Sequence, residues 1–558
     1  MRLFSLLLIS LSLCAKDVTV TILATTDLHG NIFPYDYLAG KPAQRGLAKI
    51  ATLVKNERKS APAALLVDCG DTIQGAPLES VYQQFVESGK LPAGLTIESG
   101  SLPIDPMMAA MNYLRYDAMA VGNHEFNYGL KNLDKARSEA RFPWLSANTQ
   151  GGGKPFEPYV VKDVDGVKVA LIGITTPGIP SWEKPENYSG YTFLDGKVAL
   201  LRTVAEVRSK HHPDLIIVLA HAGLEGSAPS TPPKENMVED LAQVDGVDAI
   251  VFGHTHNQLE GRMLGKVLVA QSKNWGMSLV RMDIKLSSKP GGRFSVDSKT
   301  SRIILATDAV EPDQEVLKIA KPYHELTERY LNTVVAQANT NLDARASRVE
   351  DTALIDAIQQ AQLYYSKADV SFASSFNPAA AIPKGPVTIR QVAALYLYDN
   401  ELYAIEGTGK MVKDALENAA RYYRSCTDDA CGKSPLINSS VIGYNYDMAE
   451  GVSYEIDLTR PEGDRVRNLI YKGKPLDPAQ KLRIALNNYR AGGSAGYTMF
   501  QGAKQVWRSY DEIRDLIIRY YAERPLPSTP TNNWRVVPET AHRTLVAETQ
   551  RSVRPQTQ

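Results

Sequence analysis

The sequence predicts a two-domain α/β protein built from layered sheets and helices. The chain has 558 residues, which is too long for a single hydrophobic core. Its first half alternates apolar, strand-like runs with helical stretches, the pattern that is typical of layered α/β folds. A second unit of helices and strands begins near residue 350, after a long helical segment.

Eight apolar runs in the first half are the predicted strands. A helical pattern at 46–59 separates the first two of them. The runs lie at 18–25, 64–68, 117–122, 167–174, 214–220, 247–253, 266–271 and 278–286.

The second half opens with a predicted long helix at 311–335, which only Pro322 interrupts and which could join the two domains. Another helix is predicted at 353–368, strands and turns follow to residue 538, and the polar end of the chain is expected to fray. We therefore expect a first domain at 17–305, a linker helix region at 306–345, a second domain at 346–540 and a polar tail at 541–558.

Composition excludes some classes of partner. Hydrophobic residues make up 44% and charged residues 22% of the chain, as in an ordinary soluble globular protein. Lys and Arg number 62, as do Asp and Glu, and no basic run would follow a nucleic-acid backbone. We expect no nucleic-acid polymer as partner, although one small anion could still be held by a local site.

The N-terminus resembles a secretory signal peptide. Met1-Arg2 supplies the positive start, Leu3–Leu13 the apolar core, and cleavage after Ala15 is plausible. The run is too short to span a bilayer comfortably and no other segment looks transmembrane, so a periplasmic or secreted protein without a stable membrane span is expected. Two alternatives are a disordered or buried N-terminal helix and a lipid anchor at Cys14, which the bulky Leu13 disfavours.

Three cysteines remain after removal of that segment. Cys426 and Cys431 are five residues apart and either close a small disulfide loop or stay as two free thiols. Cys69, at the end of an apolar strand, would be unpaired and buried.

Metal-binding residue types follow the carboxyl ends of predicted strands. Loops at these ends converge on one crevice in open α/β sheets, so distant segments could supply one site. Asp and Asn oxygens with His nitrogens suit two borderline divalent ions, for which Mn, Zn, Fe or Co are plausible. Each segment alone is weak evidence, but all five share this context: Asp27 to Asn31, Gly70-Asp71, Gly122 to Glu125, His221 to Gly223 and Gly253 to His256.

The ordered set DLHGN, GDTIQG, GNHEF, HAG and GHTH resembles the calcineurin-like metallophosphoesterases over about residues 18–290. Residues 385–417, 444–459 and 487–497 resemble the C-terminal domain of bacterial 5′-nucleotidases, and within that family the branch of 2′,3′-cyclic-nucleotide 2′-phosphodiesterases/3′-nucleotidases. The resemblance implies a layered β-sandwich flanked by helices, plus a second α/β nucleotide-binding domain joined by a long helix.

The resemblance also implies a role for each residue of the site. Asp71 would bridge two ions, and His124 would stabilise the transition state or protonate the leaving oxygen, with Asn123 as the second catalytic residue. Many relatives have an Asp three residues after this His, but here, as in the cyclic phosphodiesterase branch, the residue is Asn127. The implied ligands are Asp27, His29 and His256 for one ion, and Asn123, His221 and His254 for the other.

On the substrate side, the resemblance implies that a base stacks between Tyr398 and Tyr489, with Asn400 bonding the base or ribose. Tyr398 could instead be an ordinary strand residue. No Arg occurs in 373–385, where some nucleotidases carry an arginine cluster for a terminal phosphate, so a free 5′-phosphate is not the expected handle.

The expected reaction is hydrolysis of 2′,3′-cyclic nucleotides to 3′-nucleotides, and of these to nucleoside and phosphate, by a monomer. The alternatives are a 5′-nucleotidase or nucleotide-sugar hydrolase, a thiosulfohydrolase-like enzyme, and a non-catalytic surface binding protein. The intact ligand set disfavours the last of these.

Overall fold

The computed structural model describes residues 17–89, 104–224, 234–289, 293–398, 400–427, 430–433 and 435–552. The predicted signal peptide lies outside these residues. The chain divides into two compact units: unit 1 ends at Glu328, and unit 2 runs from Arg329 and also includes Tyr37–Ala39. Both units combine helices with β-sheets, which confirms the predicted two-domain α/β class.

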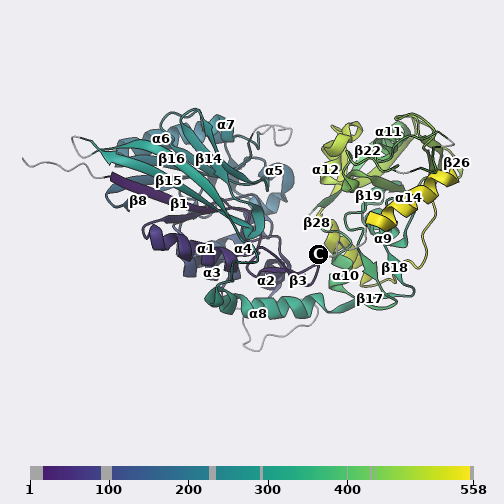
Figure 1. The fold of residues 1–558 in the computed structure, drawn as a ribbon, viewed down its shortest axis with the longest axis horizontal. Helices are drawn as coiled ribbons and strands as arrows, with labels where there is room; N and C mark the ends of the chain where they lie inside the picture. Colours follow the sequence, from purple (N-terminus) through teal and green to yellow (C-terminus); the bar gives the residue numbers. More distant parts are fainter. Residues whose placement is uncertain are drawn as a thin grey trace, which may run out of the picture. The chain divides into compact units, whose positions relative to one another are not determined.

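Unit 1 is a sandwich of two six-stranded sheets (Figure 1). In the first sheet the strand order is β16 (Phe294–Leu305), β15 (Ser278–Ser288), β1 (Asp17–Thr25), β4 (Leu65–Asp68), β5 (Ala118–Ala120) and β6 (Trp144–Leu145). In the second it is β13 (Leu259–Leu264), β14 (Val267–Gln271), β12 (Ala249–Phe252), β11 (Leu215–His221), β9 (Val167–Thr175) and β8 (Tyr159–Val164).

Helices cover the outer faces of unit 1. Two small sheets of short strands lie in its connecting segments. The helices are α1 (Leu47–Ser60), α2 (Pro77–Ser88), α3 (Pro106–Leu114), α4 (Gly129–Glu139), α5 (Ile179–Trp182), α6 (Gly196–His211) and α7 (Val238–Leu241). Two-stranded sheets pair β2 (Tyr35–Asp36) with β3 (Lys41–Pro42) and β7 (Thr149–Gly151) with β10 (Tyr191–Phe193).

Strand β11 is apolar from Leu215 to Ala220, ahead of His221, because both of its faces are buried. Ile217 and Leu219 lie in the core between the two sheets, whereas Val218 and Ala220 lie in a second core that includes residues of α6. A strand buried on both sides has no need for polar alternation, which explains why its sequence is one continuous apolar run.

All eight predicted strands are present, with ends that differ from the prediction by two residues at most. Strands β1, β4 and β5 are parallel neighbours in the first sheet, as are β9, β11 and β12 in the second. The loops after these strands therefore leave at the same edge of their sheet, where the predicted ligands lie.

The predicted long helix is shorter than expected. Helix α8 spans Gln314–Leu331 and contains Pro322, but the chain turns at Thr333 and continues as β17 (Val334–Ala338). The two β-branched valines that begin β17 favour a strand, and β17 pairs with β21 (Gly385–Thr388).

Unit 2 contains a five-stranded and a four-stranded sheet around one hydrophobic core. The five-stranded order is β23 (Asp447–Glu450), β19 (Val370–Ser374), β27 (Lys481–Asn487), β22 (Glu401–Thr408) and β28 (Gln505–Glu512). The four-stranded order is β26 (Lys474–Pro475), β25 (Val466–Tyr471), β24 (Ser453–Asp457) and β29 (Trp534–Val537), and β18 (Leu342–Asp343) pairs with β20 (Ala381–Ile382). Its helices are α9 (Ala353–Ser366), α10 (Ile389–Ala393), α11 (Gly409–Ala420), α12 (Asn488–Ala491), α13 (Ile513–Tyr521) and α14 (Glu539–Ser552).

The expected polar tail at 541–558 is wrong for its first twelve residues. Helix α14 continues to Ser552, and Ala541 and Leu545 are completely buried in the core of unit 2. These two apolar residues are one helical turn apart, so they anchor an otherwise polar helix.

The open question about the cysteines has a definite answer. Cys426 and Cys431 form a disulfide, and Cys69 is a buried free thiol.

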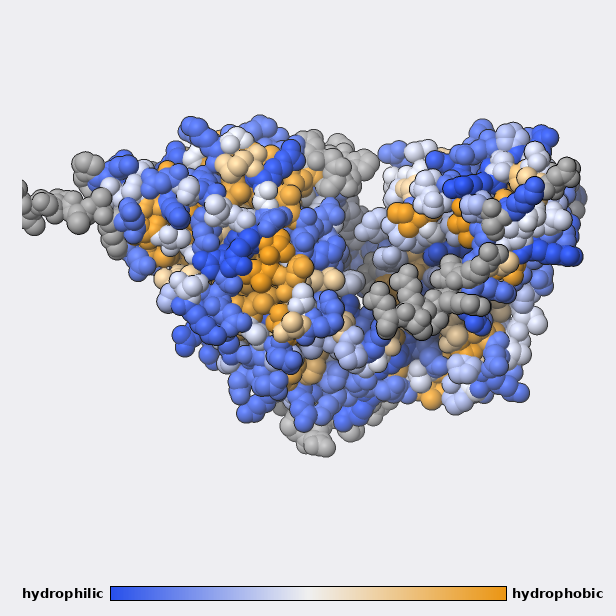
Figure 2. Space-filling model, in the orientation of Figure 1, coloured by the Kyte–Doolittle hydropathy of each residue, from blue (hydrophilic) through white to orange (hydrophobic). Residues whose placement is uncertain are grey.

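Hydrophilic side chains cover most of the face in Figure 2, with apolar side chains gathered in patches. Among the described residues, no helix has the length and apolar character needed to cross a membrane.

Candidate metal centre

Five of the predicted ligands have a left-handed backbone. The φ angles are 51° for Asp27, 47° for His29, 58° for Asp71, 74° for His254 and 55° for His256. Residues other than glycine rarely adopt this conformation, at a cost of about 1 kcal/mol or more each, and such residues cluster at functional sites. These sharp turns at the strand ends bring the five side chains together.

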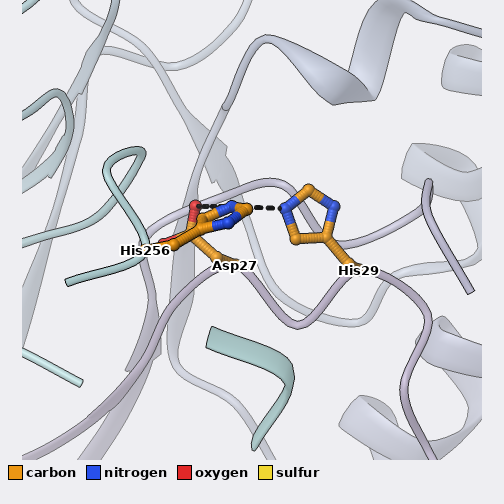
Figure 3. Close-up of side chains that lie close together, drawn as sticks. All are labelled: Asp27, His29 and His256. Carbon is orange, nitrogen blue, oxygen red and sulfur yellow. Dashed lines mark hydrogen bonds and ion pairs between the residues drawn. The ribbon is translucent and has the colours of Figure 1, made fainter. Parts of the chain in front are cut away.

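The first ligand group consists of Asp27, His29 and His256 (Figure 3). Their ligand atoms all lie within 4.8 Å of one another. The Nε2 atoms of His29 and His256 are 2.9 Å apart, and Nε2 of His256 lies 3.6 Å from Oδ1 of Asp27. Sequence-distant loops thus converge on one point, because Asp27 follows β1 and His256 follows β12.

The second ligand group consists of Asp71, His221 and His254. Nε2 of His221 is 3.0 Å from Oδ2 of Asp71 and 3.0 Å from Oδ1 of Asn123. The same Asn123 oxygen is 3.1 Å from Nδ1 of His254. The residues that the resemblance assigns to the second ion are therefore close together.

Asp71 lies between the two groups. Its Oδ2 is 3.9 Å from Nε2 of His29, in the first group, and 3.0 Å from Nε2 of His221, in the second. Its Oδ1 accepts a hydrogen bond from the backbone N–H of His124 at 2.8 Å. One oxygen thus fixes the carboxylate to the backbone, and the other faces both groups.

Backbone carbonyls fix the tautomers of two histidines. Nδ1 of His29 lies 2.9 Å from the carbonyl oxygen of Gln74, and Nδ1 of His221 lies 2.7 Å from that of Cys69. Because a carbonyl only accepts, each Nδ1 carries a proton, so the neutral ring that a metal ion requires would direct its Nε2 lone pair at the cluster. Such converging nitrogen and oxygen lone pairs are the donor set that a divalent cation requires, so these residues fit two metal ions.

The charge balance of the cluster agrees with that fit. Burial lowers the pKa of His29 and of His256 to about 4, so both rings are neutral at pH 7. Burial alone would raise the pKa of Asp71, but the charges of His221 and His124 hold it well below its usual value. Burial likewise disfavours a charged His221, yet the negative charge of Asp71 raises its pKa to about 10. The site therefore stabilises positive charge beside Asp71.

His124 lies beside the ligand cluster but belongs to neither ligand group. Its side chain is 31% exposed, and its Nε2 lies 3.9 Å from Oδ2 of Asp71. Its Nδ1 forms a short hydrogen bond with Oδ1 of Asn127. An accessible Nε2 beside the ligand cluster is the geometry that a proton donor or transition-state contact needs.

Sequence reasoning missed the role of Glu125. This buried carboxylate accepts backbone N–H groups of Asp71 at 2.9 Å, Thr72 at 2.6 Å and Gly122 at 2.7 Å. It therefore joins the loop after β4 to the loop after β5. The position of Glu125 directly after His124 was the only sequence feature that pointed to a role in the site. The role itself could not be inferred, because its partners in the other loop are more than fifty residues away in sequence.

The predicted substrate residues lie in unit 2. The ring of Tyr398 is 45% exposed and its centroid lies 4.9 Å from that of Phe376, and Tyr489 on α12 is 61% exposed. Both rings therefore offer open aromatic surface. Asn400 is only 6% exposed and donates to the hydroxyl of Tyr396 at 3.2 Å, so its contact in this structure is internal.

Comparison with known proteins agrees with this geometry. The calcineurin-like phosphoesterase family matches residues 20–258, and the 5′-nucleotidase C-terminal domain matches residues 334–502. The chain is 30% identical to the 2′,3′-cyclic-nucleotide 2′-phosphodiesterase/3′-nucleotidase of Yersinia enterocolitica, over 94% of this chain and 88% of that protein. The chain belongs to the 5′-nucleotidase family of metallophosphoesterases.

Other members of the 5′-nucleotidase family are similar over comparable lengths of this chain. The chain is 32% identical to the trifunctional nucleotide phosphoesterase protein YfkN of Bacillus subtilis, over 94% of this chain but only 39% of that protein. The solved structure of a putative 5′-nucleotidase from Staphylococcus aureus matches with a TM-score of 0.70 and 26% identity, covering 93% of this chain and all of that one. The match to the calcineurin-like phosphoesterases makes this chain a metal-dependent phosphoester hydrolase. Its two ligand groups fit the dimetal site that this family implies.

Proposed function

We propose that the protein hydrolyses 2′,3′-cyclic nucleotides to 3′-nucleotides, and 3′-nucleotides to nucleoside and phosphate. The observation that carries the proposal is the pair of ligand groups with Asp71 between them. The reaction is the one named for the relative from Yersinia enterocolitica, which is similar to this chain along nearly its whole length.

One divalent ion would be held by Asp27, His29 and His256. The other would be held by Asn123, His221 and His254. Asp71 would bind both ions. When bound, the two ions supply Lewis acidity, which neutralises charge on phosphoryl oxygens and lowers the pKa of water. Asp71 contacts an imidazole of each group, and Asn123 contacts the two imidazoles of the second group. When its ring is doubly protonated, His124 presents an Nε2–H group that can donate a hydrogen bond to a phosphoryl oxygen or a proton to the leaving oxygen.

On the nucleoside side, Tyr398 and Tyr489 would stack on the base. Their exposed rings provide a surface with little base preference, worth about 1–3 kcal/mol per stacked base. Asn400 would contribute through Tyr396, which it contacts, or bind the base or ribose directly after a side-chain rotation. The lack of Arg in 373–385 supports a preference for substrates without a free 5′-phosphate.

A second candidate is 5′-nucleotidase activity. It is favoured by the match of residues 334–502 to the 5′-nucleotidase C-terminal domain and by the fold similarity to the putative 5′-nucleotidase from Staphylococcus aureus. We place the enzyme in the periplasm or outside the cell because of the signal-like segment at 1–15.

The deciding experiment measures phosphate release from 2′,3′-cyclic AMP, 3′-AMP and 5′-AMP by chelated enzyme reloaded with Mn²⁺. For the cyclic substrate, added alkaline phosphatase detects a 3′-nucleotide that is released before its second hydrolysis. Rapid turnover of the first two substrates and slow turnover of 5′-AMP would support the proposal. A preference for 5′-AMP would overturn it in favour of the second candidate.

A further inference from the structure

A chain of side-chain hydrogen bonds leads from His124 to a buried carboxylate that no sequence motif marks. Nδ1 of His124 meets Oδ1 of Asn127, and Nδ2 of Asn127 donates to Oε1 of Glu183. Nδ2 of Asn187 donates to the other oxygen, Oε2, at 2.7 Å. Glu183 is 7% exposed and directly follows α5, fifty-six residues after Asn127.

Glu183 decides which way the Asn127 amide points. An asparagine amide has a donor end and an acceptor end of nearly equal size, so its neighbours determine its orientation. Both carboxyl oxygens of Glu183 accept, one from Asn127 and the other from Asn187, which requires the Asn127 NH₂ group to face Glu183. The carbonyl oxygen of Asn127 must then face His124.

The orientation of that amide in turn decides the tautomer of His124. With an acceptor oxygen at Nδ1, the ring keeps a proton on Nδ1 in both its neutral and its doubly protonated form, so Nε2, beside Asp71, is the nitrogen that can carry a further proton to a substrate oxygen. A reversed amide would point NH₂ at Nδ1 and favour the opposite tautomer. The amide alone could adopt either orientation, whereas the carboxylate behind it allows one.

We propose that Glu183 is a positioning residue, which acts through Asn127 to fix the tautomer and ring orientation of His124. The proposal rests on the proposed function of His124 as the residue that contacts substrate oxygen. It assigns to Glu183 and Asn127 together the task that a single Asp performs at the Asn127 position in many relatives.

Two features show that Glu183 is itself held in place. Its backbone N–H donates to the carbonyl of Ile179 at 2.9 Å, which closes the short helix α5. Asn187, which donates to Oε2, also donates to the backbone carbonyl of Asn127 at 2.9 Å. The carboxylate and the residue that it orients are therefore tied to the same neighbour.

The first test is Glu183→Gln, which keeps the shape of the side chain but gives it a donor end. In the variant, only one end of the side chain is an acceptor oxygen, so it can no longer accept from Asn127 with one end and from Asn187 with the other. The constraint on the Asn127 amide is thereby lost, and this amide can rotate. We expect kcat to fall about 10- to 100-fold with little change in KM, the usual size of an effect from an outer partner of a site residue. Glu186→Gln, at an exposed position of the same segment, is the matched control and should change neither constant.

The second test exchanges the two groups in the double variant Asn127→Asp with Glu183→Gln. The introduced aspartate then accepts from Nδ1 of His124 in any orientation, while the introduced glutamine donates to that aspartate and accepts from Asn187. Every hydrogen bond of the chain is restored, so activity should recover to within a few-fold of wild type. Asn127→Asp alone puts two carboxylates in contact and should be less active than the double variant.

A readout without substrate completes the test. In zinc-loaded protein with ¹⁵N-labelled histidine, long-range ¹H–¹⁵N correlation spectra report the tautomer of His124, assigned by the signals that His124→Asn removes. We expect an Nδ1–H ring in the wild type and double variant, and a change in Glu183→Gln. An unchanged tautomer and kcat in folded Glu183→Gln, or a folded double variant no more active than it, would overturn the proposal. Failure of the wild type to hydrolyse any nucleotide would instead overturn the proposed function, and the spectra would still test Glu183.

Discussion

Nε2 of His221 lies 3.0 Å from Oδ2 of Asp71, and both side chains are buried. A buried carboxylate beside imidazole rings costs desolvation energy that a cation offsets. The two side chains come from loops that are far apart in sequence, after β4 of one sheet and β11 of the other. The contact therefore depends on the packing of the whole sandwich.

Replacement of that carboxylate tests its position between the groups. Asp71→Asn removes the charge shared by the two ligand groups but keeps the side-chain shape. We expect a loss of phosphoesterase activity of at least about 1,000-fold, equivalent to ~4 kcal/mol of transition-state stabilisation, and reduced metal content. Activity assays and elemental analysis of the purified variant measure the two effects. The control Asp245→Asn, at an exposed position of unit 1, should match wild type in activity and in metal content. Two tightly held ions in Asp71→Asn would contradict the bridging role of Asp71.

Glu125 offers a test of the loop framework rather than of the ligands. Glu125→Gln replaces one acceptor oxygen by an NH₂ group, so at least one of the three backbone N–H groups loses its acceptor. We expect a loss of about 3 kcal/mol in the free energy of unfolding, together with weaker metal binding. Urea denaturation and metal titration measure these, with the exposed Glu87→Gln as control. Stability equal to wild type would show that the loops do not need this carboxylate.

Much of the fold and ligand set was predictable because the signals are local. Each ligand loop directly follows an apolar strand, and a continuous apolar run such as 214–220 is recognisable without knowledge of its neighbours. The end of the long helix was less predictable: Val334 and Val335 continue its apolar spacing, and their preference for a strand becomes decisive only through the pairing of β17 with β21.

The roles of Glu125 and Glu183 could not be predicted for the opposite reason. Both act through partners that are distant in sequence, and a lone glutamate resembles any solvated surface residue. The C-terminal segment was misjudged because its two buried residues, Ala541 and Leu545, are few among many polar ones. Their burial depends on a core formed by the rest of unit 2.

Tyr398 tests the substrate surface of unit 2. In Tyr398→Ala, loss of one stacking contact should reduce kcat/KM about 5- to 150-fold, mainly through a higher KM, since stacking stabilises substrate and transition state alike. Steady-state kinetics with 3′-AMP measure the change, and Tyr364→Ala, another exposed tyrosine of unit 2, serves as control. Equal KM values in Tyr398→Ala and wild type would remove Tyr398 from the site.

Asp356 gives unit 2 a stability that depends on pH. Its side chain is 2% exposed and accepts from the backbone N–H of Thr531 at 2.8 Å. Burial, followed by the charge of Asp351, raises the pKa of Asp356 to about 7. The folded state therefore prefers the protonated acid, and the unfolded chain ionises it near pH 4.

The sign of the effect follows from these two pKa values. The stability that Asp356 contributes is fully present below about pH 4, falls as pH rises from about 4 to about 7, and stays low above about pH 7. Asp356→Asn keeps an oxygen for Thr531 but carries no proton to lose. Its stability relative to wild type should therefore increase between about pH 4.5 and about pH 8, by on the order of 2 kcal/mol once solvent screening is allowed for. Denaturant unfolding of unit 2 at both pH values measures the difference, with the exposed Asp477→Asn as control. An advantage that is equal at both pH values would mean that Asp356 is ionised in the folded protein throughout this range.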